Sequence, residues 1–204
     1  SLPTIADLAE PELRLAGIRI NPANAGPTRE PYYSNLSLLR LSDGGTTTIT
    51  GLPTQPRIRN VKWAPDSARF AFTLTMADRI ELWVADAASG KARRLIPARL
   101  HAIFGSQFHW MPSSKALMVS TVPAGRAAAP AAPDVPQGPV IQQNMGEAAP
   151  ARTYQDLLET PFDADLFEYH ARAQIVRTDL SGKVEPVGKP ALFTELRPSP
   201  DGRY

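Results

Sequence analysis

The sequence predicts an all-β fold of short antiparallel strands, and two observations support this prediction. Apolar and polar residues alternate with a period of two in short runs, which are separated by turns rich in Gly, Pro, Asp and Ser. A strand–turn–strand phrase also recurs, as NVKWAPDSARFAFTLT, QFHWMPSSKALMVST and, in shortened form, ELRPSPDGRY. Internal repetition of this kind is typical of architectures built from stacked repeats.

The spacing of the phrase indicates which repeat architecture to expect. Its equivalent prolines are Pro65, Pro112 and Pro200, at intervals of 47 and 88 residues. The first interval matches the period of about 40–50 residues of a β-propeller blade. The second is nearly two periods, or one period with an insert, and the lack of a strand pattern in residues 122–150 favours the insert. We therefore predict a partial β-propeller of four-stranded antiparallel blades.

The strands follow in chain order. We expect one strand over 13–20, a hairpin over 37–50 around the turn SDGG, and one complete blade with strands over 58–63, 70–75, 80–86 and 92–96. In the next blade we expect strands over 115–121, 173–180 and 184–188. Residues 1–204 would then be part of one N-terminal propeller with incomplete blades at both ends. Such an arc would expose apolar faces and sheet edges, so we expect it to be a piece of a larger protein.

Residues 122–170 interrupt one blade as a loop-plus-helix insert. The first part is rich in Ala, Pro and Gly, and proline removes the backbone donors that a strand needs. After it we predict a helix capped by Thr153 that continues through Leu157 and Leu158, and a second, short helix from Pro161 or Asp163. Long inserts of this kind are commonly functional.

The composition excludes several kinds of partner. The formal charge is +2 and the basic residues are scattered, which does not predict a nucleic-acid surface. No apolar run approaches the roughly 20 residues of a membrane span, so no membrane partner is predicted. There are no cysteines for disulfides or thiolate metal sites. We predict no metal and no cofactor, because His101, His109 and His170 are too scattered for metal-ligand spacing and are interpreted as core or surface histidines.

The tryptophans and the turn aspartates have structural interpretations. Trp63, Trp83 and Trp110 occupy strand positions and are predicted to be packing residues. Asp66 and Asp201 are predicted to form turns. Neither group is predicted to form a functional site.

Several longer sequence segments resemble those of a known protein family. The run PTIADLAEPELRLAGIRINP at 3–22, the word ELWVAD at 81–86, and the insert words GPVIQQNMG at 138–146, RTYQDLL at 152–158 and DLFEY at 165–169 resemble the prolyl oligopeptidase family, in its glutamyl endopeptidase branch. The similarity extends over nearly the whole chain. The insert words are the most discriminating, because many propellers share the other two.

The resemblance implies a bacterial serine peptidase, periplasmic or secreted, with relatives in plant chloroplasts. In that family a propeller precedes a C-terminal α/β-hydrolase domain, whose Ser, Asp and His cut peptide bonds, here after glutamate. The propeller would filter the peptide substrates that reach the catalytic site. No G-x-S-x-G nucleophile motif occurs in the 204 residues, so no catalytic residue is predicted in this chain.

Two arginines of the insert are candidates for substrate binding. A preference for glutamate requires a cation or several donors facing a carboxylate, and the planar fork of arginine suits that geometry. Arg152 is the first candidate and Arg126 the second. The alternative for Arg152 is an ion pair with Asp156 or Glu159 that only stabilises the helix. An alternative for the whole chain also remains: a non-enzymatic propeller that binds a peptide or protein partner.

Overall fold

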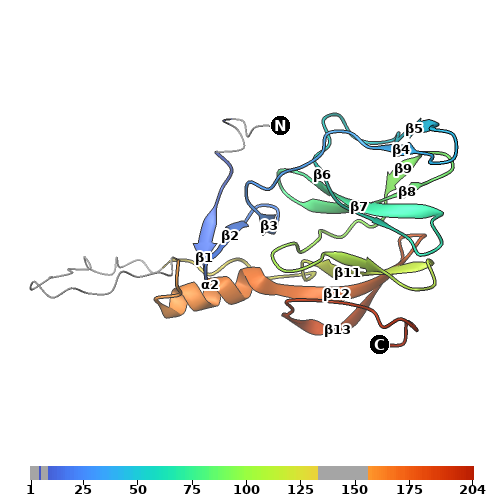
Figure 1. Ribbon diagram of the computed structural model, residues 1–204. Helices are drawn as coiled ribbons and strands as arrows, with labels where there is room; N and C mark the ends of the chain where they lie inside the picture. Colours follow the sequence, from blue (N-terminus) through green and yellow to red (C-terminus); the bar gives the residue numbers. More distant parts are fainter. Residues whose placement is uncertain (1–4, 6–8, 133–155) are drawn as a thin grey trace, which may run out of the picture.

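The computed structural model describes residues 5, 9–132 and 156–204, which form mostly antiparallel sheets. The elements are β1 (Leu13–Leu15), β2 (Ile18–Asn21), β3 (Gly26–Pro27), β4 (Ser37–Leu39), β5 (Thr46–Thr48), β6 (Ile58–Trp63), β7 (Arg69–Thr75), β8 (Ile80–Asp86), β9 (Ala92–Arg94), β10 (Phe108–Trp110), β11 (Ala116–Thr121), α2 (Pro161–Ala171), β12 (Arg172–Asp179) and β13 (Val184–Leu192). Two four-stranded sheets, β6-β7-β8-β9 and β10-β11-β12-β13, follow the chain in simple up-and-down order (Figure 1). They confirm the predicted all-β fold of four-stranded antiparallel blades.

The two four-stranded sheets pack on each other through a shared apolar core. Its buried members come from both sheets and from the segment between them: Ala64, Ala71, Ile80, Leu82, Val84, Leu95, Ile96, Leu100, Ala102, Phe108, Trp110, Leu117, Val119 and Val176. A second cluster, with Ile58, Phe70 and Phe72 among its buried members, lies on the other face of the first sheet, against Leu36 and Leu38 around β4. Burial on both faces explains why β7 is apolar almost throughout instead of strictly alternating.

The three copies of the repeated phrase form the same turn. The residue two positions after each proline has a positive φ: 58° at Ser67, 59° at Ser114 and 71° at Gly202. Its amide donates to the carbonyl three residues earlier at 2.9 Å in each copy. The Asp66 amide also donates to Ser114 Oγ at 3.0 Å, which places the first turn beside the second.

The third turn is a neighbour of the second. A Cβ on Gly202 would lie 3.5 Å from Pro112 Cδ and from Met111 Cε. The interval of 88 residues between the second and third copies therefore contains one four-stranded sheet, in which β11 pairs directly with β12. The pairing of Thr121 with Gln174 shows that residues 122–171 leave and re-enter this sheet at the same end.

The prediction of a single strand over residues 13–20 is wrong. Leu15 pairs with Ile18, and the two residues between them form a tight hairpin turn. Ala16 has φ 52° and Gly17 has φ 75°, as a two-residue turn with two left-handed positions requires. Alanine rarely adopts this conformation, so an apolar run that contains it does not signal a turn.

The second helix of the insert is confirmed as α2. Thr160 Oγ1 accepts from the Asp163 amide at 3.1 Å and the Asp163 carboxylate accepts from the Thr160 amide at 2.9 Å, which forms a capping box. Of the first predicted helix, Thr153 lies outside the described residues, and Leu157 and Leu158 belong to no helix. The φ of 59° at Asp156 and the proline after Thr160 both oppose helical backbone there. No helix in the described residues is long and apolar enough to cross a bilayer.

Candidate functional site

Arg126, one of the two candidate substrate-binding residues, contacts α2 at the base of the insert. It lies a few residues after β11, and its guanidinium carbon is 4.2 Å from the centre of the Tyr169 ring. Its Nη1 also donates to the Tyr169 carbonyl at 3.2 Å. These contacts join the start of the insert to the last turn of α2. Arg152, the other candidate, lies outside the described residues.

Two histidines that are 69 residues apart meet beside Arg126. His101 Nε2 lies 2.7 Å from the carbonyl oxygen of His170, and both side chains are buried. Because a carbonyl oxygen only accepts, Nε2 of His101 carries the proton. Burial, then the charges of Arg126 and His101, lower the pKa of His170 to about 4, so His170 is neutral at pH 7. Of the two alternatives left open by the sequence, core or surface, the structure shows the core for both residues.

The charge of Arg126 is not neutralised by any carboxylate in the described part of the chain. Its contacts there are the aromatic ring and the carbonyl of Tyr169, which use one of its five N–H donors. Burial also leaves Nδ1 of His170 without a hydrogen-bond partner among the described residues. Among the described residues, the base of the insert therefore holds a half-buried cation whose remaining N–H donors have no partner, which is the chemistry that a carboxylate ligand requires.

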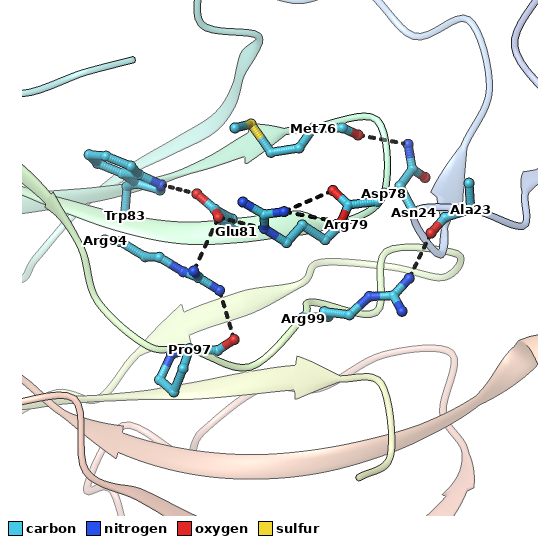
Figure 2. Close-up of polar contacts among 10 residues, drawn as sticks. All are labelled: Ala23, Asn24, Met76, Asp78, Arg79, Glu81, Trp83, Arg94, Pro97 and Arg99. Carbon is cyan, nitrogen blue, oxygen red and sulfur yellow. Dashed lines mark hydrogen bonds and ion pairs between the residues drawn. The ribbon is translucent and has the colours of Figure 1, made fainter. Parts of the chain in front are cut away.

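A buried carboxylate lies at the start of β8, on the side of the blade that carries the β7–β8 turn (Figure 2). The Glu81 side chain is 4% exposed, and its Oε1 lies 2.7 Å from Arg79 Nε and 3.3 Å from Arg94 Nη1. The other oxygen, Oε2, accepts from Trp83 Nε1 at 2.9 Å. Burial raises the pKa of Glu81, but these hydrogen bonds and charges outweigh it and hold the pKa below its usual value.

The Glu81 network is structural. With both oxygens paired, Glu81 has little capacity left to accept a proton from a substrate, so it is a poor general base. The network was not predicted from the sequence, where the segment ELWVAD contributed only to the family resemblance. A glutamate inside a strand of buried residues was the available signal, because such a charge requires partners.

Loops near the insert gather at the same end of the sheets as this network. Arg99 Nη2 donates to the Ala23 carbonyl at 2.6 Å, and Asn24 Nδ2 donates to the Met76 carbonyl at 3.4 Å (Figure 2). The Arg99 carbonyl in turn accepts from the Val122 amide at the start of the insert, at 3.0 Å. The β2–β3 loop, the β7–β8 turn and the base of the insert are thus linked.

The turn aspartates and tryptophans mostly have the predicted roles. Asp66 Oδ1 accepts from the Ala68 amide at 3.0 Å, and Asp201 Oδ1 accepts from the Arg203 amide at 3.1 Å. Trp110 is buried in the larger core and donates to a backbone carbonyl. Trp63 departs from the prediction, because 50% of its surface is exposed although its ring contacts Phe70.

The described residues provide binding chemistry but no assembled catalytic centre. They contain no group of three or more His, Cys, Asp or Glu residues that could hold a metal ion. The fold and these contacts define the class: a segment of stacked propeller-type blades with an insert whose base is cationic.

Comparison with known proteins identifies what the segment resembles. The chain is 39% identical over 218 residues to a protein of Oryza sativa subsp. japonica named "Probable glutamyl endopeptidase, chloroplastic", and 40% identical over 217 residues to a protein of the same name from Arabidopsis thaliana. Both alignments cover 100% of this chain but only 23% and 22% of the relatives, so the chain spans less than a quarter of their length. The predicted resemblance to glutamyl endopeptidases is confirmed.

Solved structures with similar folds are less similar to this chain in sequence. TolB from Acinetobacter baumannii superposes with a TM-score of 0.45 at 15% identity, covering 83% of this chain and 30% of that one. An acylaminoacyl peptidase from Pyrococcus horikoshii superposes with a TM-score of 0.42 at 16% identity, covering 76% of this chain and 20% of that one. No protein-family model matches the chain.

The predicted bacterial periplasmic or secreted location is wrong by this comparison. Both curated relatives are plant proteins named as chloroplastic. The prediction came from the bacterial side of the family resemblance, and the chain contains no local sequence feature that reports a compartment.

Proposed function

We propose that this chain is the propeller segment of a serine peptidase that hydrolyses peptide bonds after glutamate. The observation that carries the proposal is the identity of 39% to 40% with two proteins named glutamyl endopeptidase, sustained over the whole chain. The catalytic Ser, Asp and His would lie in a C-terminal α/β-hydrolase domain outside residues 1–204. There the serine would form an acyl-enzyme with help from the histidine, and water would then release the product.

In this proposal residues 1–204 belong to one N-terminal propeller, and the insert of about 122–170 interrupts one of its blades. The propeller partners the hydrolase domain and limits which peptides reach the catalytic serine, so it contributes access and not chemistry. Short or unfolded peptides would pass, and folded proteins would be excluded. The sheets of the described residues do not close into a ring, which supports a role within a larger propeller.

Arg126 and Arg152 are the proposed contacts to the substrate glutamate. The guanidinium of Arg126 supports this role, because it is cationic and contacts only Tyr169 within the described residues. Arg152 stays a prediction from its position and charge.

The first experiment asks whether the full-length protein that contains this chain has an activated serine. It is treated with a fluorophosphonate probe and analysed by denaturing mass spectrometry. We expect one label, on a serine outside residues 1–204, and cleavage of a peptide with glutamate before the scissile bond. Replacing that glutamate by glutamine should lower kcat/KM by about 10-fold to 100-fold, the value of one or two charge-assisted hydrogen bonds. A protein that neither takes the label nor cleaves would instead be a non-enzymatic propeller.

Access is tested separately with one cleavage sequence in two contexts. The enzyme should cleave a short peptide much faster than the same sequence in an exposed loop of a folded protein. Equal kcat/KM values for both substrates would remove the filtering role while leaving the peptidase assignment intact.

The arginines are tested by Arg126→Met and Arg152→Met in the full-length enzyme. Loss of the preference for glutamate over glutamine identifies a substrate contact. Arg177→Met is the matched control, because Arg177 is an exposed arginine that pairs with Glu185 on β13. A variant that keeps the wild-type preference removes its arginine from the proposed site.

A further inference from the structure

Three basic residues occupy the same position in the three copies of the repeated phrase. Lys62, His109 and Arg197 each precede the proline of their copy by three residues. Lys62 lies in β6 and His109 in β10, which are the first strands of the two four-stranded sheets, and Arg197 lies in the corresponding segment before the third turn. The three turns are neighbours, so the equivalent residues before them form one layer across three consecutive repeats.

Hydrogen bonds place Lys62 beside the strand of His109, and the turn that follows Arg197 lies against Met111 and Pro112, just after His109. Lys62 Nζ donates to the Phe108 carbonyl at 3.1 Å and also contacts Ser106 Oγ, so it reaches the chain immediately before His109. The charge of Arg197 acts on both of the others. After burial, it is a cause of the lowered pKa of Lys62, and Lys62 and Arg197 together contribute to the lowered pKa of His109.

A second polar layer lies two residues earlier in each copy. Asn60, Gln107 and Glu195 each precede the proline by five residues. Asn60 Nδ2 donates to Gln107 Oε1 at 2.6 Å, so these equivalent residues bond directly across two sheets. Glu195 Oε1 accepts from Arg197 Nε at 2.7 Å, which links the two layers. The first strands of the two four-stranded sheets and the corresponding segment of the third copy therefore carry polar side chains at equivalent positions.

The basic layer is not neutralised. Glu195 pairs with Arg197, but no carboxylate in the described part of the chain pairs with Lys62. Nε2 of His109 is buried and has no hydrogen-bond partner there. The side chain of Arg197 is 74% exposed and its fork keeps further N–H donors. In the described part of the chain this layer thus combines two basic side chains and an imidazole nitrogen without a hydrogen-bond partner, and of the two basic side chains Glu195 pairs with Arg197 alone.

We propose that Lys62, His109 and Arg197 form a binding site for the carboxylate of an acidic peptide. The site rests on the proposed function, because a peptidase that cuts after glutamate handles peptides that carry such groups. Propeller blades surround a central channel, and a cationic layer repeated on the first strand of successive blades would attract acidic peptides along that channel. The layer would then select substrates by charge before they reach the catalytic domain. It acts on acidic residues away from the scissile bond and is distinct from the contacts proposed for Arg126.

The experiment measures binding, which does not depend on catalysis. A fluorescent peptide with four glutamates and a matched peptide with four glutamines are titrated by anisotropy into the full-length protein, at low salt, after its serine has been blocked. We expect tighter binding of the glutamate peptide, and we expect Lys62→Met and Arg197→Met each to weaken it about tenfold, the value of one charge-assisted hydrogen bond. Arg197 is exposed, so its variant tests the site without disturbing the core.

Lys183→Met is the matched control. Lys183 is also an exposed cation with a carboxylate partner, Glu185, but it lies at the β12–β13 turn. The proposal is overturned if the two peptides bind equally, or if Lys183→Met weakens binding as much as Arg197→Met does. If the protein takes no fluorophosphonate label, the binding assay is carried out without the blocking step. Charge-selective binding would then support the site although the peptidase proposal had failed.

Discussion

Replacing Glu81 by glutamine tests whether the buried network stabilises the blade. The substitution keeps the size and shape of the side chain and removes its charge. The remaining amide oxygen can still accept from Trp83. The new NH₂ group then faces the guanidinium groups of both Arg79 and Arg94, so donors meet a donor where the wild-type protein has two ion pairs.

The expected loss follows from the two ion pairs. The Glu81 side chain is only 4% exposed, and its Oε1 lies 2.7 Å from Arg79 Nε. A charge-assisted hydrogen bond of this kind is worth about 1.5–3 kcal/mol. The contact with Arg94 is longer, at 3.3 Å, and the 35% exposure of that arginine allows water to screen it, so it adds about 0.5 kcal/mol. We expect Glu81→Gln to lower the free energy of unfolding by about 2–3 kcal/mol.

Urea unfolding of the full-length protein, followed by tryptophan fluorescence, measures this loss. The midpoint of the transition that includes this segment should fall by about 1 M urea, given m-values of about 1–3 kcal/mol/M. Glu185→Gln is the control, because Glu185 also contacts two cations, Lys183 and Arg177, but is 50% exposed. Its substitution should lower the midpoint much less, because water screens an exposed ion pair. Equal midpoints for the two variants would refute the reasoning that burial makes the Glu81 network valuable.

The loss of stability in Glu81→Gln should depend on pH. The pKa of Glu81 in the folded protein lies below 4.5. A carboxylate with a lowered pKa contributes stability that is complete above its unfolded pKa and is lost as the pH falls through the folded value. The difference between wild type and Glu81→Gln should therefore be constant from pH 7 to about 5 and shrink below pH 4.5. A difference that persists unchanged at pH 3 would contradict the ionic origin of the stabilisation.

Three further predictions concern the core, a turn and a buried histidine. Leu82→Ala, in the centre of the larger core with 0% exposure, should cost about 3 kcal/mol in urea unfolding, and a cost below 1 kcal/mol would contradict the packing described. Gly51→Ala should lower the free energy of unfolding by about 1–3 kcal/mol more than Gly125→Ala does. Both glycines have a positive φ, but only at Gly51 would the new Cβ lie 2.4 Å from a backbone oxygen, that of Ala92. Equal losses for the two variants would refute this clash. The pKa of His170 is about 4 in the folded protein and 6.5 in the unfolded chain, so the unfolded chain takes up the proton first as the pH falls. The free energy of unfolding should therefore decrease as the pH drops from 6.5 to 4. In a series of urea titrations, His170→Gln should flatten this pH dependence.

The sequence predicted the fold where the signal was local. β6 and β8 have the predicted bounds, because each is a short run with apolar residues between turn residues such as Pro, Asp and Ser. The start of α2 was also predicted, since a cap, a proline and an acidic residue lie within four positions. The failures have local causes as well. Ala16 takes a left-handed conformation that alanine rarely adopts, and Leu157 belongs to no helix although its neighbours suit one.

The candidate site was predicted less completely than the fold. Arg126 was chosen for its charge and its place in the insert, but its stacking on Tyr169, 43 residues away, was not foreseen. His101 and His170 were each assigned to the core or the surface without any sign that they meet. A single chain has no local pattern that reports such pairs.

The sequence by itself therefore determined the repeat, its turns and most of the strands, because these depend on residues within a few positions of one another. The tertiary structure decided which distant residues share a surface. Lys62, His109 and Arg197 are separated by 47 and 88 positions, and only the stacking of consecutive repeats brings their side chains together. Strand pairing and sheet packing set these distances, and both depend on burying apolar faces contributed by the whole chain.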